Sequence, residues 1–503
     1  MDTISPHSYW WSDAFLQEAP TYAPLDQESR ADVAIIGAGI TGLTAAAHLK
    51  ASGRRVVVLE AGRVGAGTTG GSTGHLEVHP DPGFRALLRD LGESGARQVT
   101  EARRQAIAQI RAWSSDASGC DFVPVPAFFY AETEDDVSLV EEEHDAARRA
   151  GVEARLVADV PLPFPCAAGL RLENQARVQI TPYLRLLAAL VHGDGSRVHE
   201  YSRVIQPPTE GAPCTVATAR GRVVADDVIV ATHSGFFGIS HLDLRVAPYQ
   251  SYVVAVEIAD EVDDALFWDT ASPYHYTRLS SSASPGTLLV GGADHKTGQG
   301  DGPSHLAALE EYVAQRFRVP RVTHRWSAEL FEPADALPLI GRMPLSNHLY
   351  VASGFSGSGL TWGTAAARII SDLIAGRPNA TAAWVSPSRW KPVAAASNFV
   401  QENFNIAKRF VLDRLAAHAL DRMEDVPAGE GRLVRSKDRL LAAYRDPAGA
   451  VHVRSAVCPH AGCIVQWNGA ERTWDCPCHG GRFAPRGERI YGPPADDLHP
   501  APS

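Results

Sequence analysis

The chain has 503 residues, of which 45% are hydrophobic and 21% charged, and its formal net charge is −11. This length is too great for one compact core and predicts two or three domains. The acidic balance argues against a nucleic-acid partner, and no apolar stretch approaches the roughly 18–20 residues of a membrane span. No signal-peptide pattern opens the sequence, so we expect a cytoplasmic protein.

The first predicted element is a buried strand at 33–36, followed at once by the turn Gly37-Ala38-Gly39-Ile40-Thr41-Gly42. Helix-forming residues occupy 43–50, and a second apolar strand at 56–59 ends in Glu60. This strand–turn–helix–strand order is typical of a dinucleotide-binding unit.

Each residue type in this unit has a physical role. Gly37 permits the tight turn, Gly39 lets the backbone approach a pyrophosphate, and Gly42 lets the helix pack closely on the strand. The helix N-terminus offers unpaired N–H groups to phosphates. Glu60 is expected to accept hydrogen bonds from the adenosine ribose.

A loop rich in Gly, Thr and Ser occupies residues 61–74. The dinucleotide unit alone does not distinguish NAD from FAD. The loop favours FAD, because it could wrap a pyrophosphate and a flavin ring with backbone donors; an ordinary surface loop is the alternative.

Residues 33–76 resemble the opening of the D-amino-acid-oxidase/glycine-oxidase superfamily of FAD enzymes. The segment 225–233 resembles that superfamily's strand returning to the flavin domain, and 335–341 with 349–361 resemble its closing FAD motif. The resemblance implies an α/β FAD-binding Rossmann-type domain with an inserted mixed-sheet substrate domain. It implies cofactor contacts from Gly37, Gly39, Gly42, Glu60, Ala61, Arg63, Thr68, Val204, Gly341, Gly354, Gly357, Gly359 and Thr361.

In some amine-oxidising relatives a histidine directly after a Gly-Thr-Thr-Trp run binds the flavin covalently. Here Gly67-Thr68-Thr69 continues with Gly70-Gly71, and His75 lies four positions further on. We therefore expect non-covalent FAD.

The section between the flavin motifs predicts helices at 85–112 and 136–150 and strands at 250–257 and 286–293. In the resembling superfamily this section roofs the flavin and holds a small-molecule substrate. An arginine beside aromatic residues would suit a substrate carboxylate; ordinary strand aromatics with a solvated arginine are the alternative. The candidates for substrate binding are Tyr252, Tyr276 and Arg278. No catalytic acid or base can be assigned from spacing.

Prolines interrupt residues 376–393, and a helix-like stretch follows from about 394 to 422. After it, short alternating runs at 431–434, 440–444 and 450–453 predict a small antiparallel β-domain.

Two cysteine- and histidine-containing loops belong to this last domain: Cys458-Pro459-His460 and Cys476-Pro477-Cys478-His479. Two thiolates and two imidazoles could bind zinc, but a [2Fe–2S] cluster with two Cys and two His ligands also fits the count. The pattern resembles Rieske proteins, which implies the cluster ligands Cys458, His460, Cys476 and His479.

In Rieske proteins of cytochrome bc-type complexes, two cysteines at the positions equivalent to Cys463 and Cys478 form a disulfide between the two loops. The resemblance therefore implies a Cys463–Cys478 bridge here. The chain departs from that subgroup at Gly481 and Phe483, where Ser and often Tyr donate hydrogen bonds toward sulfur. Fewer donors should lower the reduction potential, and we predict a value below the top of the Rieske range of roughly −150 to +300 mV.

The predicted organisation is an FAD-dependent oxidoreductase domain at 1–385, a linker and helix at 386–424, and a small all-β Rieske domain at 425–503. Within the first domain, FAD-binding parts are expected near 30–80, 195–240 and 330–380, and the substrate part near 81–194 and 241–329.

The leading functional hypothesis is oxidation of an amino acid or secondary amine by FAD. Electrons would pass to the cluster and leave through its solvent-facing histidines to an external one-electron acceptor. Two alternatives remain at this point: an external donor reduces the cluster and thereby FAD in a reductive or oxygen-activating reaction, or the protein is a redox sensor or electron carrier.

Overall fold

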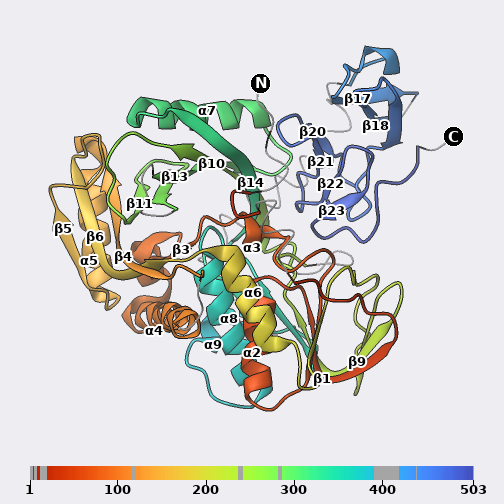
Figure 1. Cartoon of the computed structure of the whole chain (residues 1–503), viewed down its shortest axis with the longest axis horizontal. Helices are drawn as coiled ribbons and strands as arrows, with labels where there is room; N and C mark the ends of the chain where they lie inside the picture. The colour runs from red at the N-terminus through yellow and green to blue at the C-terminus, as the bar shows by residue number, and fades with distance from the viewer. Residues whose placement is uncertain are drawn as a thin grey trace.

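The computed structural model describes residues 4, 8–11, 20–115, 119–235, 242–280, 286–389, 419–437 and 439–501. Two large sheets lie in the first three quarters of the chain, and two small sheets follow near the C-terminus. Figure 1 shows the small sheets (blue) beside the upper of the two large ones.

The first large sheet has the strand order β15-β16-β9-β1-β2-β7, with β8 paired to β9. Its centre is parallel, because β1 pairs in parallel with both β2 and β9. Continuous runs of β-branched residues form these strands, as expected for a sheet covered on both faces. The bounds are β1 Glu28–Ile36, β2 Val56–Leu59, β7 Arg197–His199, β8 Cys214–Ala217, β9 Arg222–Val230, β15 Leu339–Arg342 and β16 Leu349–Ser353.

The second large sheet is mostly antiparallel and has the order β14-β10-β13-β12-β11-β4-β6-β3, with β5 paired to β6. Its bounds are β3 His75–Leu76, β4 Val123–Ala131, β5 Ala154–Val157, β6 Ala168–Arg177, β10 Val246–Glu257, β11 Leu266–Asp269, β12 Tyr276–Leu279, β13 Thr287–Lys296 and β14 Arg321–Pro333. Strand β14 reaches the cluster domain and the first sheet, so this sheet connects all parts of the molecule (Figure 1).

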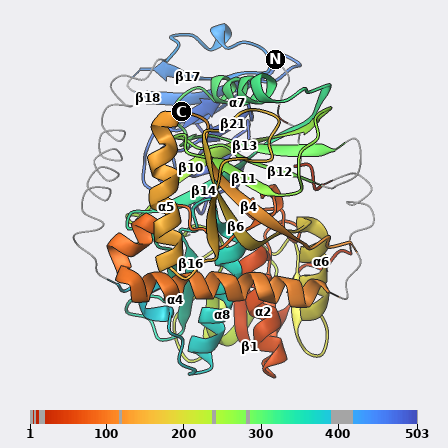
Figure 2. The ribbon, with the colours of Figure 1, turned by 90° about the vertical axis from the view of Figure 1, so that its left-hand side faces the viewer.

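Helices α2 (Ile40–Ala51) and α8 (Gly359–Ile374) pack against each other beside the first sheet. Helix α4 (Gly83–Ser114) lies across them in Figure 2 and bends at Gly92, which has a φ of 65°. The remaining helices are α3 Thr68–Gly71, α5 Val137–Arg149, α6 Ile180–Val191, α7 Gly302–Arg316 and α9 Ala382–Val385.

The C-terminal part contains a three-stranded sheet, β17-β18-β19, and a four-stranded sheet, β20-β21-β22-β23. The turn between β18 and β19 closes with a hydrogen bond from Gly449 N to Asp446 O at 2.9 Å. The bounds are β17 Gly431–Ser436, β18 Arg439–Arg445, β19 Val451–Ser455, β20 Gln466–Asn468, β21 Thr473–Asp475, β22 Arg482–Phe483 and β23 Arg489–Tyr491.

The structure confirms the predicted fold class and most of the expected elements. It corrects the loop expected at 61–74, which contains the short helix α3. The helix-like stretch expected at about 394–422 lies almost wholly outside the described residues. The domain boundaries remain a prediction.

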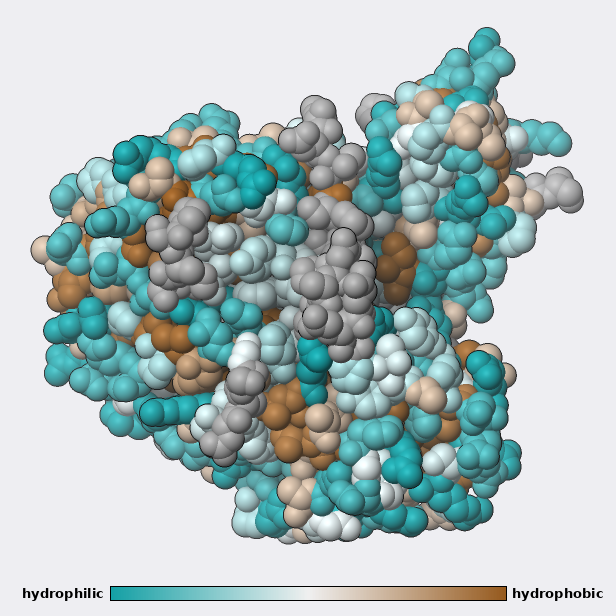
Figure 3. Space-filling view, viewed as in Figure 1, coloured by the Kyte–Doolittle hydropathy of each residue, from teal (hydrophilic) through white to brown (hydrophobic). Residues whose placement is uncertain are grey.

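On the face shown in Figure 3, apolar residues form small separate patches among hydrophilic ones. Among the helices that the structure describes, none combines the length and the apolar composition that crossing a bilayer requires.

Candidate functional site

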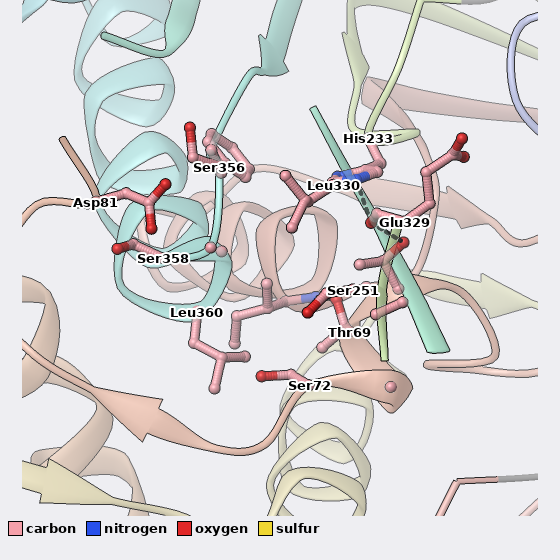
Figure 4. Close-up of a pocket in the computed structure, with 18 of the residues that line it drawn as sticks. Thr69, Ser72, Asp81, His233, Ser251, Glu329, Leu330, Ser356, Ser358 and Leu360 are labelled. Carbon is pink, nitrogen blue, oxygen red and sulfur yellow. Dashed lines mark hydrogen bonds between the residues drawn. The ribbon is translucent and has the colours of Figure 1, made fainter. Parts of the chain in front are cut away.

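A cavity of about 1070 Å³ lies where the two large sheets and the cluster domain meet. The first glycine turn, helix α3 and the loop before α8 contribute to its lining, together with strands β12 and β13 and residues 489–492 of the cluster domain. Figure 4 shows Asp81 and Ser358 on one side of this cavity and His233 and Glu329 on the other.

The glycine turn between β1 and α2 has the geometry that a bound dinucleotide requires. Gly37 has a φ of 105°, a conformation that favours glycine. A Cβ atom at Gly42 would overlap the carbonyl oxygen of Gly37, so the helix approaches the strand as closely as the sequence predicts. A Cβ atom at Gly39 would lie 2.9 Å from Thr69 Oγ1.

Two helix N-termini meet the cavity. Helix α2 begins after Gly39 and helix α8 after Ser358, and neither N-cap residue caps its helix, although Ile40 N donates to Thr69 Oγ1 at 3.2 Å. Gly39, Ile40, Gly359 and Leu360 all line the cavity. Since N–H groups of a first helical turn lack intrahelical acceptors, both ends present donors to a phosphate or to flavin carbonyls.

Glu60 lines the cavity at the end of β2. Its carboxylate accepts hydrogen bonds from Ala38 N and Gly62 N, both at 2.8 Å. These bonds hold the side chain beside the glycine turn, where a ribose would lie. Burial raises the pKa of Glu60, and the two backbone donors oppose that effect.

Most of the residues predicted to contact FAD line this cavity: Gly37, Gly39, Glu60, Ala61, Thr68, Val204, Gly357 and Gly359. The others lie outside its lining: Gly42, Arg63, Gly341, Gly354 and Thr361. Gly42 acts through helix packing, as above, and Arg63 instead lies 4.0 Å from Glu200 beside a separate small cavity. The residues that line the cavity fit FAD.

The three residues predicted to bind substrate lie in different environments in the structure. Tyr276 lines the cavity, and its hydroxyl lies 2.9 Å from Ser251 Oγ. Tyr252 is fully buried outside the lining and contacts Asn468 of the cluster domain. Arg278 is also fully buried, and its guanidinium donates to the carbonyl oxygens of Thr73, Val178 and Leu279. In this structure Arg278 and Tyr252 therefore make no contact with the cavity.

Asp81 and Asp294 line the cavity and were not singled out by the sequence analysis. The Tyr274 hydroxyl donates to Asp81 Oδ1 at 2.7 Å, and Ser251 hydrogen-bonds to Asp294. Burial raises the pKa of Asp294 to about 7, and the nearby charge of Asp81 adds to this effect. No local pattern identifies these residues, because strand β13 and the loop before α4 meet only in the tertiary fold.

The four predicted cluster ligands come together at the tips of two loops. Backbone N–H groups of His460 and Ala461 hydrogen-bond to the sulfur of Cys458, and those of Cys478 and His479 to that of Cys476. The rings of His460 and His479 have centroids 4.9 Å apart. Both nitrogens of each ring are shielded from solvent and have no hydrogen-bond partner among the described residues. Buried imidazoles without partners fit a bound metal cluster.

A disulfide joins Cys463 to Cys478, with the Cα atoms 6.5 Å apart. Each ligand loop is also closed by its own backbone bonds, from Cys458 N to Cys463 O at 2.8 Å and from Cys476 N to Gly481 O at 2.7 Å. The bridge that the resemblance implied is therefore present, and it ties the two ligand loops together.

The histidine side of the cluster site does not face solvent, contrary to our expectation. The side chain of His460 is 1% exposed, and its Nε2 lies 3.9 Å from Oδ2 of Asp243, which precedes β10. His479 is likewise buried. Packing of the cluster domain on the rest of the chain covers both rings, and sequence patterns of one domain do not reveal such packing.

The cluster domain also forms part of the cavity wall. Gly480, the neighbour of His479, has a φ of 72°, and a Cβ atom there would overlap Glu329 Oε1. Glu329 is 2% exposed and lines the cavity. On strand β23, the Tyr491 hydroxyl lies 2.7 Å from Thr68 Oγ1.

Comparisons with known proteins agree with this geometry. The family described as FAD dependent oxidoreductase matches residues 32–373, and the Rieske [2Fe-2S] domain matches residues 417–502. YhfW of Bacillus subtilis (strain 168), whose name describes a Rieske 2Fe-2S iron-sulfur protein, is 30% identical over 97% of this chain and 96% of its own length. Gamma-glutamylputrescine oxidoreductase of Escherichia coli (strain K12) is 27% identical over 73% of this chain and 89% of its own length.

Among solved structures, glycine oxidase from Geobacillus kaustophilus superposes with a TM-score of 0.60 at 19% identity, covering 72% of this chain and all of that one. That likeness shows the fold of the first three quarters of the chain. The chain therefore belongs to the FAD dependent oxidoreductase family and carries a C-terminal Rieske domain, with FAD and a [2Fe–2S] cluster as its cofactors.

Proposed function

We propose that this protein oxidises an amino acid or amine with FAD and passes the electrons through its Rieske cluster to an external one-electron acceptor. FAD supplies a two-electron oxidant when bound, and the cluster carries one electron at a time. The relatives named as a gamma-glutamylputrescine oxidoreductase and a glycine oxidase support a C–N bond as the site of oxidation.

The observation that carries the proposal is the contact between the cluster loop and the cavity wall. Gly480, one residue after the proposed ligand His479, packs on Glu329. A Cβ atom placed at Gly480 would lie 2.8 Å from Pro248 Cβ. Tyr491 of the same domain enters the cavity lining. A cluster held against the cofactor cavity is suited to exchange electrons with the flavin inside one chain.

Two buried titratable residues, His233 and Glu329, lie in the cavity wall that the cluster domain contacts. His233 Nε2 donates to the carbonyl oxygen of Glu329 at 3.0 Å, and burial lowers the pKa of His233 to about 4. Burial raises the pKa of the Glu329 carboxyl well above its usual range. Burial therefore disfavours the charged form of both side chains.

The buried histidines support an inward direction for the first transfer. Since His460 lies beside Asp243 and the residue after His479, Gly480, packs on Glu329, we assign the histidine side of the cluster to electron entry from FAD. An external acceptor would then use another face of the cluster domain or require the domain to move.

Anaerobic addition of a panel of amines and amino acids to the protein loaded with both cofactors tests the proposal. We expect flavin bleaching, followed by the EPR signal of a reduced Rieske cluster. Bleaching only by NAD(P)H with a reductase would contradict the proposed direction, and no bleaching with any compound of the panel would contradict a metabolic oxidase.

A further inference from the structure

Two carboxylates in the cavity, Asp81 and Asp294, have no cation within ion-pair distance among the described residues; Arg103 acts on Asp81, and His275 on Asp294, from further away. No lysine or arginine forms an ion pair with Asp81 or Asp294 within the part of the chain that the structure describes. Asp294 Oδ1 is shielded from bulk solvent and accepts no hydrogen bond from any described residue. A buried acceptor without a donor is unfavourable, and a ligand that supplies the donor would remove that penalty.

Three other acids of this cavity already have a partner, whereas Glu329, whose Oε2 also accepts no hydrogen bond from a described residue, packs against Gly480 of the cluster domain. Glu143 pairs with His79 at 2.9 Å, and Asp269 pairs with His275 at 2.8 Å. Glu77 lies 3.7 Å from the buried Arg103. Asp81 and Asp294 therefore differ from Glu143, Asp269 and Glu77 in forming no ion pair with a described residue.

The cavity's arginines do not supply that counter-charge. Arg85 and Arg89 lie on the exposed side of α4, paired with Glu142 and Asp90. Arg203 and Arg489 belong to the opposite part of the lining, where Arg203 interacts with Glu60. Arg278, the residue expected to bind a carboxylate, is occupied by backbone carbonyls.

The two carboxylates lie close to the place expected for the flavin. A Cβ atom at Gly357, in the loop before α8, would lie 2.8 Å from Asp81 Oδ1 and 2.5 Å from the Tyr274 hydroxyl oxygen. Ser251 links Asp294 to Tyr276. Figure 4 shows Asp81 beside Ser356 and Ser358 of the same loop.

We propose that Asp294, with Asp81 and the hydroxyls of Tyr274 and Tyr276, binds the positive charge of an alkylamine substrate that carries no carboxylate. This inference rests on the proposed function and narrows its substrate class. Aromatic rings beside paired carboxylates suit an ammonium group, since the ring faces and the oxygens both attract a cation. Burial and the nearby charge of Asp81 raise the pKa of Asp294, and a cationic ligand would stabilise its ionised form.

A metal ion is a poorer occupant. A metal site needs several ligand atoms close together. Among the described residues, the three potential metal-ligating side chains whose ligand atoms lie within 4.8 Å of one another belong to the cluster domain: Cys463, Cys476 and Cys478. The acids of the cavity do not converge in this way, so they offer no three-ligand cation centre.

A matched series of four-carbon probes tests the inference: butylamine, 1,4-diaminobutane and 4-aminobutanoate. Binding to the FAD-loaded full chain is measured by anaerobic calorimetry, and flavin bleaching is followed separately. We expect both amines to bind at least tenfold more tightly than 4-aminobutanoate. We expect Asp294→Asn to weaken butylamine binding at least tenfold and Asp294→Glu to restore part of it.

The control is Asp145→Asn on helix α5, where the side chain is 80% exposed; it should leave binding unchanged. If Asp294→Asn fails to retain FAD, Asp81→Asn serves the same purpose. Equal binding of 4-aminobutanoate and butylamine, displacement of butylamine by Mg²⁺ at equal concentration, or unaltered binding in both variants would overturn the inference. Tight amine binding without flavin bleaching would uphold the inferred amine site and refute the proposed oxidation. Bleaching by carboxylate-bearing amino acids alone would refute the inferred amine site and uphold the proposed oxidation.

Discussion

The hydroxyl of Tyr491, on the last strand of the Rieske domain, lies 2.7 Å from Oγ1 of Thr68, on helix α3 at the edge of the FAD cavity. The two residues are 423 positions apart in the sequence. This hydrogen bond fastens the cluster domain to the loop that the sequence identifies with flavin binding.

Tyr491→Ala removes both this bond and the ring that covers the cavity edge. We expect FAD to be reduced by substrate at the wild-type rate and electron transfer to the cluster to slow several-fold, because the domain is held less firmly. Stopped-flow absorbance separates the two steps. Tyr201→Ala, at a side chain that is 60% exposed, is the matched control. Unchanged cluster reduction in Tyr491→Ala would argue against transfer across this contact.

Gly480→Ala tests the contact with Glu329. The new Cβ would overlap Glu329 Oε1 and lie 2.8 Å from Pro248 Cβ, so the domain must shift to accommodate it. The control is Gly449→Ala, which has a similar left-handed φ of 92° and open space around it, and it should cost only about 1–2 kcal/mol of backbone strain.

We expect Gly480→Ala to lower the Tm more than Gly449→Ala and to slow flavin-to-cluster transfer. Glu329→Ala combined with Gly480→Ala should restore part of the transfer rate, because it removes the overlapping carboxyl. Equal Tm values for the two glycine variants would contradict this account of the interface.

Glu329 predicts a pH dependence of stability. Burial raises the pKa of Glu329, and the charge of Arg482, which pairs with Glu471 and Asp475, opposes this effect without cancelling it. Above the ordinary glutamate pKa of about 4.3, the unfolded chain releases a proton that the folded chain keeps, so folding becomes less favourable as pH rises.

Glu329→Gln keeps the shape and removes this titration. As pH rises from 5 to 8, the Tm of Glu329→Gln, measured by thermal unfolding, should therefore increase relative to the Tm of the wild type. A difference that stays constant over this range would show that Glu329 is ionised in the folded protein.

Asp243 predicts a change in reduction potential. Its buried carboxylate lies 3.9 Å from His460 Nε2, and a negative charge there disfavours the reduced, more negative cluster. Asp243→Asn should raise the midpoint potential by tens of millivolts in an EPR-monitored redox titration. Asp226→Asn, at an exposed position on β9, should leave it unchanged. The wild-type value is expected below about +300 mV, since Gly481 and Phe483 supply no hydroxyl donors toward sulfur.

FAD is expected to be held without a covalent bond. His75 lies on the cavity wall and interacts through Nδ1 with Thr73 Oγ1 at 2.9 Å, while no described residue hydrogen-bonds to its Nε2. Acid precipitation should release the yellow chromophore into the supernatant. Retention of the colour in the pellet would identify a covalent link, with His75 as the first residue to substitute.

The sequence alone determined those features that depend on local spacing. The glycine turn at Gly37, the acidic end of β2 at Glu60 and the two Cys–His loops each lie within a short segment, where the backbone conformation and the ligand chemistry restrict the choice of residue. The family resemblances that these motifs carry implied the fold class, both cofactors and the disulfide.

The tertiary structure decided which residues from distant segments meet. Arg278 and Tyr252 have the chemistry of substrate ligands, but β12 and β10 direct them into backbone contacts and into the cluster interface. Asp81 and Asp294 have no local signature and face one cavity only because the loop before α4 meets β13. The burial of His460 against Asp243 follows from domain packing, because the surfaces that exclude water there belong to segments more than 200 residues apart.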